Sequence, residues 1–186
     1  MTGMKLFYSS IGIFLIFCST TFAHEKKWPE RRLRQVWPEA QVFTSKQLSL
    51  TPSQINELKA DGIQTSSTDR NATFYFAQAK DSTTSKLVNL GAILFIDESG
   101  DNGSMEITIA MGNDGKTKKI NIWESSENPL ISKEEFLKQF EGKSANDQLV
   151  VEKNYKPIPG APKASEAIAK ATLKALKITN KFFEKK

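Results

Sequence analysis

The chain has 186 residues, with 26 lysine and arginine against 21 aspartate and glutamate, and a formal net charge of +5. This excess is too small to indicate a nucleic-acid-binding protein. The sequence has one cysteine, Cys18, and one histidine, His24. It therefore has no intrachain disulfide, no cysteine cluster for zinc or iron–sulfur, and no histidine or cysteine for catalysis in the body of the chain.

The first 23 residues have the pattern of a secretory signal peptide. A positive charge precedes a short apolar core at 6–17, and small residues precede a cut after Ala23. The apolar run is shorter than the roughly 20 residues that span a bilayer, which favours cleavage over a membrane anchor. Phe17 stands before Cys18, where a lipoprotein needs a small residue. We expect a periplasmic or secreted protein that begins at His24.

Two basic segments flank the expected domain, at residues 24–35 and 181–186. Either segment could contact an anionic membrane surface or an anionic partner. We favour the simpler interpretation, which is that both are solvated tails.

The body, residues 36–180, predicts a single domain that begins with a short helix and several strands. Thr51 to Gln54 has the pattern of a capping box with proline at the first helical position, and this helix should end at Asp61-Gly62. Four segments are rich in β-forming residues, at 73–79, 86–96, 105–111 and 118–123. Asn113-Asp114-Gly115 is the expected hairpin turn between the last two.

Two further helices are expected. Ser132 to Glu135 resembles a second capping box, opening a helix that carries Phe136 and Phe140 inward and ends at Gly142. A short extended piece at 148–151 comes next. From 166 to 183, apolar residues recur at spacings of three and four, which predicts a helix. The expected fold is α+β, an antiparallel sheet packed with short helices in a sandwich or split-barrel-like domain closed by the C-terminal helix.

The segment Pro159 to Ser165 is the strongest candidate for a binding site. Gly160 and Ala161 precede the last helix, where free backbone N–H groups and the positive end of the helix dipole would stabilise an anion such as a phosphomonoester. Glycine and proline are also common at ordinary loop–helix junctions, so a purely structural role is the alternative.

Other candidate groups have plain structural interpretations. Glu124 and Glu127 are either paired carboxylates or a solvated strand end, and we favour the second. Asp97, Glu98 and Asp101 could collect a hard cation, but their spacing does not follow a calcium loop. The aromatic residues are most simply core or surface groups, although one ring could stack on a planar cofactor: Trp28, Trp37, Trp123 and Phe74 to Phe76.

Several segments between Val36 and Ile178, taken together in their order along the chain, resemble the periplasmic FMN-binding domain. This domain occurs in the flavin subunits of Rnf and sodium-pumping quinone reductase complexes and in NosR-type regulators. The segments that carry the resemblance are Trp37-Pro38-Glu39-Ala40, Leu50 to Gln54, Gly91 to Phe95, Ile107 to Trp123, Glu127-Asn128-Pro129, Phe136, and Gln139 to Lys143. Leu130 departs from the family, which usually has glycine there.

The resemblance places Pro159 to Ser165 on the family motif Ser-Gly-Ala-Thr-x-Ser-Ser, whose threonine is esterified to the FMN phosphate in covalent members. Here that position is Pro162, which has neither a hydroxyl to esterify nor an N–H. The resemblance therefore implies at most noncovalent FMN, with its phosphate on the amides of Gly160, Ala161 and Lys163. Ser165 retains a family hydroxyl, and Glu127 and Asn128 would lie beside the flavin.

Two functions follow as hypotheses. The first is a periplasmic electron-transfer protein that holds FMN noncovalently and works with a membrane redox complex or a periplasmic haem protein, with no nucleic acid involved. The second is a flavin-free relative of the domain that acts as a binding or assembly subunit. In both, an accessory role is more consistent with the sequence than an enzyme with its own turnover.

Overall fold

The computed structural model describes residues 28–123 and 125–183. The predicted signal peptide, Glu124 and the last three residues of the chain lie outside the described residues.

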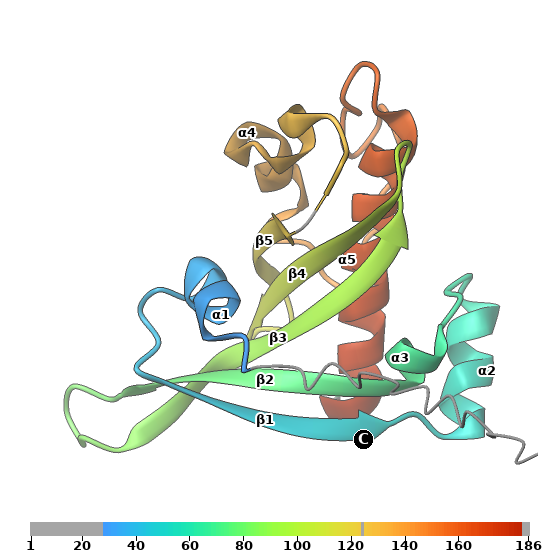
Figure 1. Ribbon diagram of the computed structural model, residues 1–186. Helices are drawn as coiled ribbons and strands as arrows, with labels where there is room; N and C mark the ends of the chain where they lie inside the picture. The colour runs from blue at the N-terminus through green and yellow to red at the C-terminus, as the bar shows by residue number, and fades with distance from the viewer. Residues whose placement is uncertain (1–27, 124, 184–186) are drawn as a thin grey trace, which may run out of the picture.

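The centre of the fold is an antiparallel sheet of five strands in which every strand pairs with its neighbour in sequence (Figure 1). The strands are β1 (Val42–Ser49), β2 (Asn71–Lys80), β3 (Leu87–Ser99), β4 (Ser104–Gly112) and β5 (Thr117–Trp123). The four predicted strands are confirmed, and β1 is an additional strand. Asn113 to Gly115 forms the predicted turn, with φ of +72° at Gly115.

The helices are α1 (Glu30–Val36), α2 (Pro52–Ala60), α3 (Ser67–Arg70), α4 (Glu134–Leu137) and α5 (Pro162–Phe183), with 3₁₀ turns η1 (Pro129–Ser132) and η2 (Lys138–Phe140). The long helix α5 crosses the sheet over β3 and β4 (Figure 1). An antiparallel sheet with short helices and a C-terminal helix confirms the predicted α+β class.

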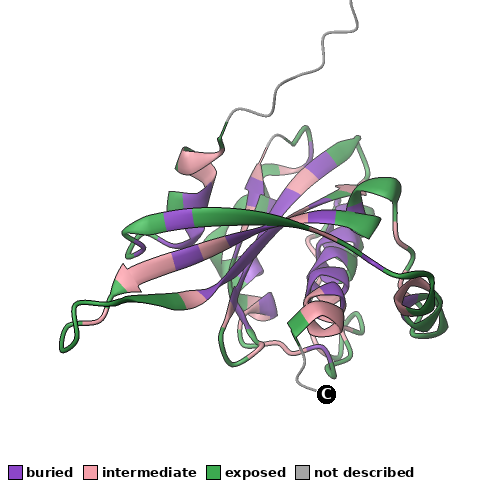
Figure 2. Cartoon of the chain, turned by 90° about the horizontal axis from the view of Figure 1, so that it is seen from below, coloured by how far each residue is buried: buried purple, intermediate pink, exposed green. Residues whose placement is uncertain are grey.

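Apolar side chains cover both faces of the sheet, because successive residues of a strand point to opposite sides. In β4, Met105, Ile107, Ile109 and Met111 belong to the larger core beneath α5, whereas Ala110 belongs to the smaller core beneath α1. Figure 2 shows buried residues in purple along the strands and along α5. The long apolar runs of β3 and β4 follow from this burial on two sides.

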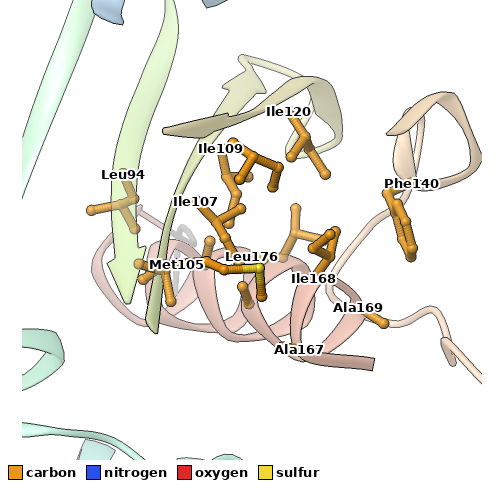
Figure 3. Packing of buried hydrophobic residues seen from close by; sticks show 14 of the residues in the cluster. Leu94, Met105, Ile107, Ile109, Ile120, Phe140, Ala167, Ile168, Ala169 and Leu176 are labelled. Carbon is orange, nitrogen blue, oxygen red and sulfur yellow. The ribbon is translucent and has the colours of Figure 1, made fainter. Parts of the chain in front are cut away.

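The buried face of α5 combines five alanines with several larger residues. Figure 3 shows Ile168 and Leu176 among the isoleucines of β4 and β5. Burying each such side chain stabilises the fold by about 1.5–3 kcal/mol. The alanines of this face, including Ala167, Ala171 and Ala175, let the helix backbone lie close to the sheet.

The predicted capping box at Thr51 is confirmed, because the Thr51 hydroxyl accepts from the Gln54 amide and the Gln54 side chain accepts from the Thr51 amide. The box predicted at Ser132 is wrong. Ser132 ends η1, and the residue before α4 is Lys133, whose side chain makes no capping bond. Gly142, with φ of +71°, does end this helical segment as predicted.

The basic segment before the domain is more than the solvated tail that the sequence favours. Its described part forms α1, whose Leu33 and Val36 are fully buried against the sheet. Arg32 forms an ion pair with Glu106 of β4. The arginines of this segment therefore occupy the polar side of an amphipathic helix, and the apolar residues between them hold it in place.

A buried charge cluster joins α5 to the sheet and to α3. The Lys174 ammonium lies 3.2 Å from Asp69 and 2.5 Å from Glu98, and Lys174 and Asp69 are only 9% and 5% exposed. A cavity of about 620 Å³ opens beside this cluster.

Among the helices that the structure describes, none has the length and apolarity needed to cross a bilayer.

Candidate functional site

The predicted binding loop lies at the N-terminal end of α5, next to the turn between β3 and β4 (Figure 1). Helix α5 begins at Pro162, four residues before the predicted start. Gly160 has φ of +80°, a left-handed conformation that favours glycine. Proline at the first helical position needs no hydrogen-bond acceptor, so the junction begins the helix without an unsatisfied amide there.

An aspartate of the same chain occupies the mouth of this helix. Asp101, in the β3–β4 turn, accepts a hydrogen bond at Oδ2 from the Ala164 amide, with 2.9 Å between the two atoms. Ala164 is the third residue of α5, and its N–H belongs to the first turn, which has no acceptor within the helix. The carboxylate thus satisfies this amide and also meets the positive end of the helix dipole.

The Ser165 hydroxyl points into the protein rather than toward a ligand. It accepts from the Ile158 amide at 2.9 Å and donates to the Ala161 carbonyl at 2.8 Å, and the residue is fully buried. The Ala161 amide is also used, because it donates to the Ile158 carbonyl at 3.0 Å. These two predicted site residues therefore shape the loop.

Gly160 and Lys163 remain the better candidates for anion contact. Both residues are exposed, and within the described residues no hydrogen bond is found from the amide of either. The Lys163 ammonium also carries its charge at the start of α5. An anion here would meet two amides and one cation, with the Asp101 carboxylate beside them.

Glu127 corrects the expectation of a solvated strand end, because it is only 7% exposed. Its carboxylate accepts from the Asn102 amide at 2.6 Å and lies 3.4 Å from the Asn102 side-chain nitrogen. Gly100 makes room for this arrangement: a β-carbon there would stand 2.5 Å from Glu127 Oε1 and 3.0 Å from the Ala164 β-carbon. Glu127 therefore anchors the β3–β4 turn beside α5.

Asn128 joins the same region from another side. Its side-chain oxygen accepts from the Leu130 amide at 3.0 Å and so begins η1. Its side-chain nitrogen lies 4.0 Å from the position that a β-carbon would take at Gly160. The structure thus brings together Glu127, Asn128 and Gly160, which the sequence indicates separately.

Trp37 and Trp123 offer little free area for a planar cofactor, whereas Trp28 is 45% exposed. Trp37 is 1% exposed, and the Lys118 ammonium lies 4.6 Å from the centroid of its ring. The guanidinium groups of Arg31 and Arg32 lie 5.2 and 5.0 Å from the ring of Trp123. A separate cavity of about 370 Å³ lies between Trp37 and the β4–β5 turn.

No metal centre forms from the acidic residues of the β3 end and the turn that follows. Glu98 pairs with Lys174, whereas Asp101 binds the Ala164 amide. Across residues 28–123 and 125–183, no three histidine, cysteine, aspartate or glutamate side chains gather closely enough to hold a metal ion.

Sequence reasoning misses Asn102, and it considers Asp101 only as a possible cation ligand and not as the acceptor at the start of α5. The Asp101 to Ala164 contact joins residues that are 63 positions apart. One available signal is the pair Gly100 and Gly103 around two polar residues, a composition typical of a tight turn between strands.

No family model matches the chain, and no curated protein matches it. Among solved structures, the crystal structure of Shewanella oneidensis NqrC is similar to this chain, with a TM-score of 0.49 and 12% sequence identity. The similar region covers 79% of this chain and 86% of that one.

Proposed function

We propose that this protein is an exported FMN-binding-domain protein that holds FMN noncovalently and takes part in electron transfer with a membrane redox complex or a periplasmic haem protein. The observation that carries this proposal is that Gly160 lies close to Glu127 and Asn128 at one end of α5. Gly160 belongs to one segment that resembles the FMN-binding domain family, and Glu127 and Asn128 belong to another.

The chain's own residues suit the phosphate end of such a cofactor. Gly160 and Lys163 are exposed residues, and their amides and the Lys163 ammonium would receive the phosphate. Pro162 rules out an ester at its position, so the flavin would exchange with solution. Bound FMN supplies the redox chemistry, and the protein supplies its position and surroundings.

A second candidate function is a flavin-free binding or assembly subunit. The observation that favours it is the Asp101 carboxylate, which already accepts a hydrogen bond at the helix mouth where a phosphate would lie. In this case the loop at 159–161 begins α5 and has no further role.

The test is the visible absorption spectrum of the protein purified from a periplasmic fraction, taken before and after incubation with FMN and again after acid precipitation. Flavin that binds and is then released by acid supports the first function. A colourless protein that also fails to bind added FMN contradicts it and leaves the flavin-free subunit.

A charge-reversal variant tests where on the protein FMN binds. Lys163→Glu adds a negative charge at the proposed phosphate position, and we expect it to weaken FMN binding at least tenfold. The matched control is Lys59→Glu, an exposed lysine in α2, which packs near the other end of α5. Equal affinities in the two variants would show that FMN, if bound, lies elsewhere.

A further inference from the structure

Residues 50–70, which we call the strap, leave the sheet after β1, form α2 and α3, and return to the sheet at β2. The two ends of the strap lie side by side. Ser49 pairs with Asn71 at the end of the β1–β2 ladder, and the Leu50 amide then donates to the Arg70 carbonyl at 2.8 Å. Because its ends are adjacent, the strap can turn about them while the strands stay paired.

A ladder of three ion pairs fastens the strap to the C-terminal half of α5, beside which α2 and α3 lie (Figure 1). Three lysines of α5 each pair with one acidic residue of the strap: Lys174 with Asp69, Lys177 with Asp61, and Lys181 with Glu57. The nitrogen–oxygen distances are 3.2, 3.0 and 2.7 Å in that order. Spacings of three and four residues place the lysines on one side of the helix. The strap therefore runs along α5 in the opposite direction, with a charge pair at successive turns.

Apolar contacts add little to this attachment. In the strap, Leu50 and Leu58 are buried, whereas Ile55 and Ile63 are only partly buried against the larger core. The two outer ion pairs have carboxylate side chains that are 46% and 51% exposed. Exposed ion pairs are individually weak and are screened by salt. The strap is therefore held less firmly than α5, which buries an apolar face along its length.

The buried lysine of the ladder has a second partner outside the strap. Lys174 contacts Asp69 of the strap at 3.2 Å and Glu98 of β3 at 2.5 Å. Removing the sole partner of a buried charge is strongly unfavourable. Because Glu98 stays with the sheet, Lys174 remains paired when Asp69 leaves. This second partner lowers the cost of releasing the strap.

The cavity of about 620 Å³ beside Lys174 lies between the strap and the rest of the protein. Residues 62–66 of the strap line it, together with Glu98 of β3 and with Lys170 and Lys174 of α5. We propose that the strap is a salt-sensitive gate, which swings away from α5 as one unit when its ion pairs break and so widens this cavity. The gate does not depend on the proposed function, because it lies along the half of α5 that is remote from the loop at 159–161.

Hydrogen exchange of the whole protein tests the gate. The amides of Ile55 and Ile63 report on opposite ends of α2, and both donate to carbonyls of the strap itself. A helix of nine residues is marginal without a surface to pack on, so both amides should exchange when the strap is released. Lys177→Glu replaces an attraction to Asp61 by a repulsion. We expect it to speed exchange at both amides by the same factor, about 3- to 10-fold, and to leave the middle of β4 unchanged.

A second charge reversal should repair the first. Adding Asp61→Lys to Lys177→Glu restores the ion pair with opposite signs, and both amides should return to within about twofold of the wild-type rate. The matched control is Lys138→Glu, the same charge change at an exposed pair with Glu134, which does not involve the strap. An equal effect in this control, or no recovery in the double variant, overturns the proposal. Acceleration at one of the two amides alone also overturns it, because that would be fraying of one end of α2.

The salt dependence of the wild type tests the gate without any substitution. Raising the salt concentration from about 0.01 M to about 1 M shortens the Debye length from roughly 30 Å to roughly 3 Å. The two strap amides should then exchange at least about twofold faster, while amides in the middle of β4 keep their rates. Strap amides that exchange at the rate of β4 in both salt concentrations would open only on global unfolding, which overturns the proposal.

Discussion

The indole ring of Trp37 lies directly against the backbone of Gly91. The Cη2 atom of Trp37 is 2.4 Å from the point where a β-carbon of residue 91 would stand, and the Met111 carbonyl oxygen is 2.1 Å from the same point. Both distances are far shorter than any nonbonded contact of a real β-carbon. The smaller core therefore requires glycine at this position of β3.

Gly91→Ala should lower the free energy of unfolding by about 1–3 kcal/mol, because the new methyl group displaces both the ring and the neighbouring strand. Urea unfolding measures the loss. Gly112→Ala is the control, since its nearest neighbour would be the movable side chain of Asp114. A loss as large in the control would show that any methyl group in this sheet is costly, and would remove the special role of Trp37.

Lys174→Met should destabilise the protein by about 3–5 kcal/mol at pH 7, because it leaves the buried Asp69 and the partly buried Glu98 without their cation. The control is Lys170→Met, an exposed lysine one turn earlier, for which we expect less than about 0.5 kcal/mol. Chemical denaturation of both variants checks the difference. Equal losses would mean that the buried cluster contributes no more than a surface pair.

The same lysine predicts a pH dependence. Burial disfavours its ammonium form, but the hydrogen bond that it donates to Glu98 and the charges of Asp69 and Glu98 outweigh burial and raise the pKa of Lys174 from its ordinary value of 10.5. A raised pKa means that the contribution to stability is fully present below pH 10.5 and is lost as pH rises through the folded-state pKa. The gap in stability between wild type and Lys174→Met should therefore narrow above pH 10.5. A gap that does not narrow as the pH rises above 10.5 would contradict this origin.

Ser165→Ala should cost about 1–3 kcal/mol, because the Ile158 amide loses the oxygen that accepts its hydrogen bond. Thr172→Val is the control: that hydroxyl only donates to the Ile168 carbonyl of its own helix, so its loss should cost less. Thermal unfolding compares the two. If Ser165→Ala instead kept its stability and lost flavin binding, Ser165 would be a ligand contact and not a structural residue.

Glu127→Ala should release the β3–β4 turn. Loss of a hydrogen bond to a charged acceptor is worth about 1.5–3 kcal/mol, which corresponds to roughly 10- to 100-fold faster hydrogen exchange at the Asn102 amide. The Gly112 amide, which donates to the Lys116 carbonyl at the other end of β4, serves as the internal control. Unchanged exchange at Asn102 would show that the turn holds its position without the glutamate.

Local patterns in the sequence account for the main elements of the fold. The capping box at Thr51, the turn at Gly115 and the spacing along α5 each predict structure correctly, because the physical cause lies within a few residues. Strand β1 is not predicted, because Phe43 is its one buried residue and the strand therefore lacks an alternation of buried apolar and exposed polar residues. The capping box predicted at Ser132 does not form, because Ser132 is the last residue of η1.

The candidate site could be predicted only in part. Its glycine loop and its position before α5 follow from the sequence, and the resemblance adds Glu127 and Asn128. The role of Asp101 could not be predicted, because the contact depends on how far the β3–β4 hairpin reaches along α5. The burial of Glu127 has the same origin, since its partner Asn102 comes from that hairpin.

The alanine-rich face of α5 has a mechanical consequence for this end of the molecule. Its alanines stand between Ile168, Leu176 and Ile178, which pack among the side chains of β3 and β4, and a close-packed interface of this kind resists sliding of the helix. Two hydrogen bonds tie the β3–β4 turn to this frame: the Asn102 amide donates to Glu127, and the Ala164 amide donates to Asp101. The turn and the start of α5 therefore hold each other's position, although they are far apart in the sequence.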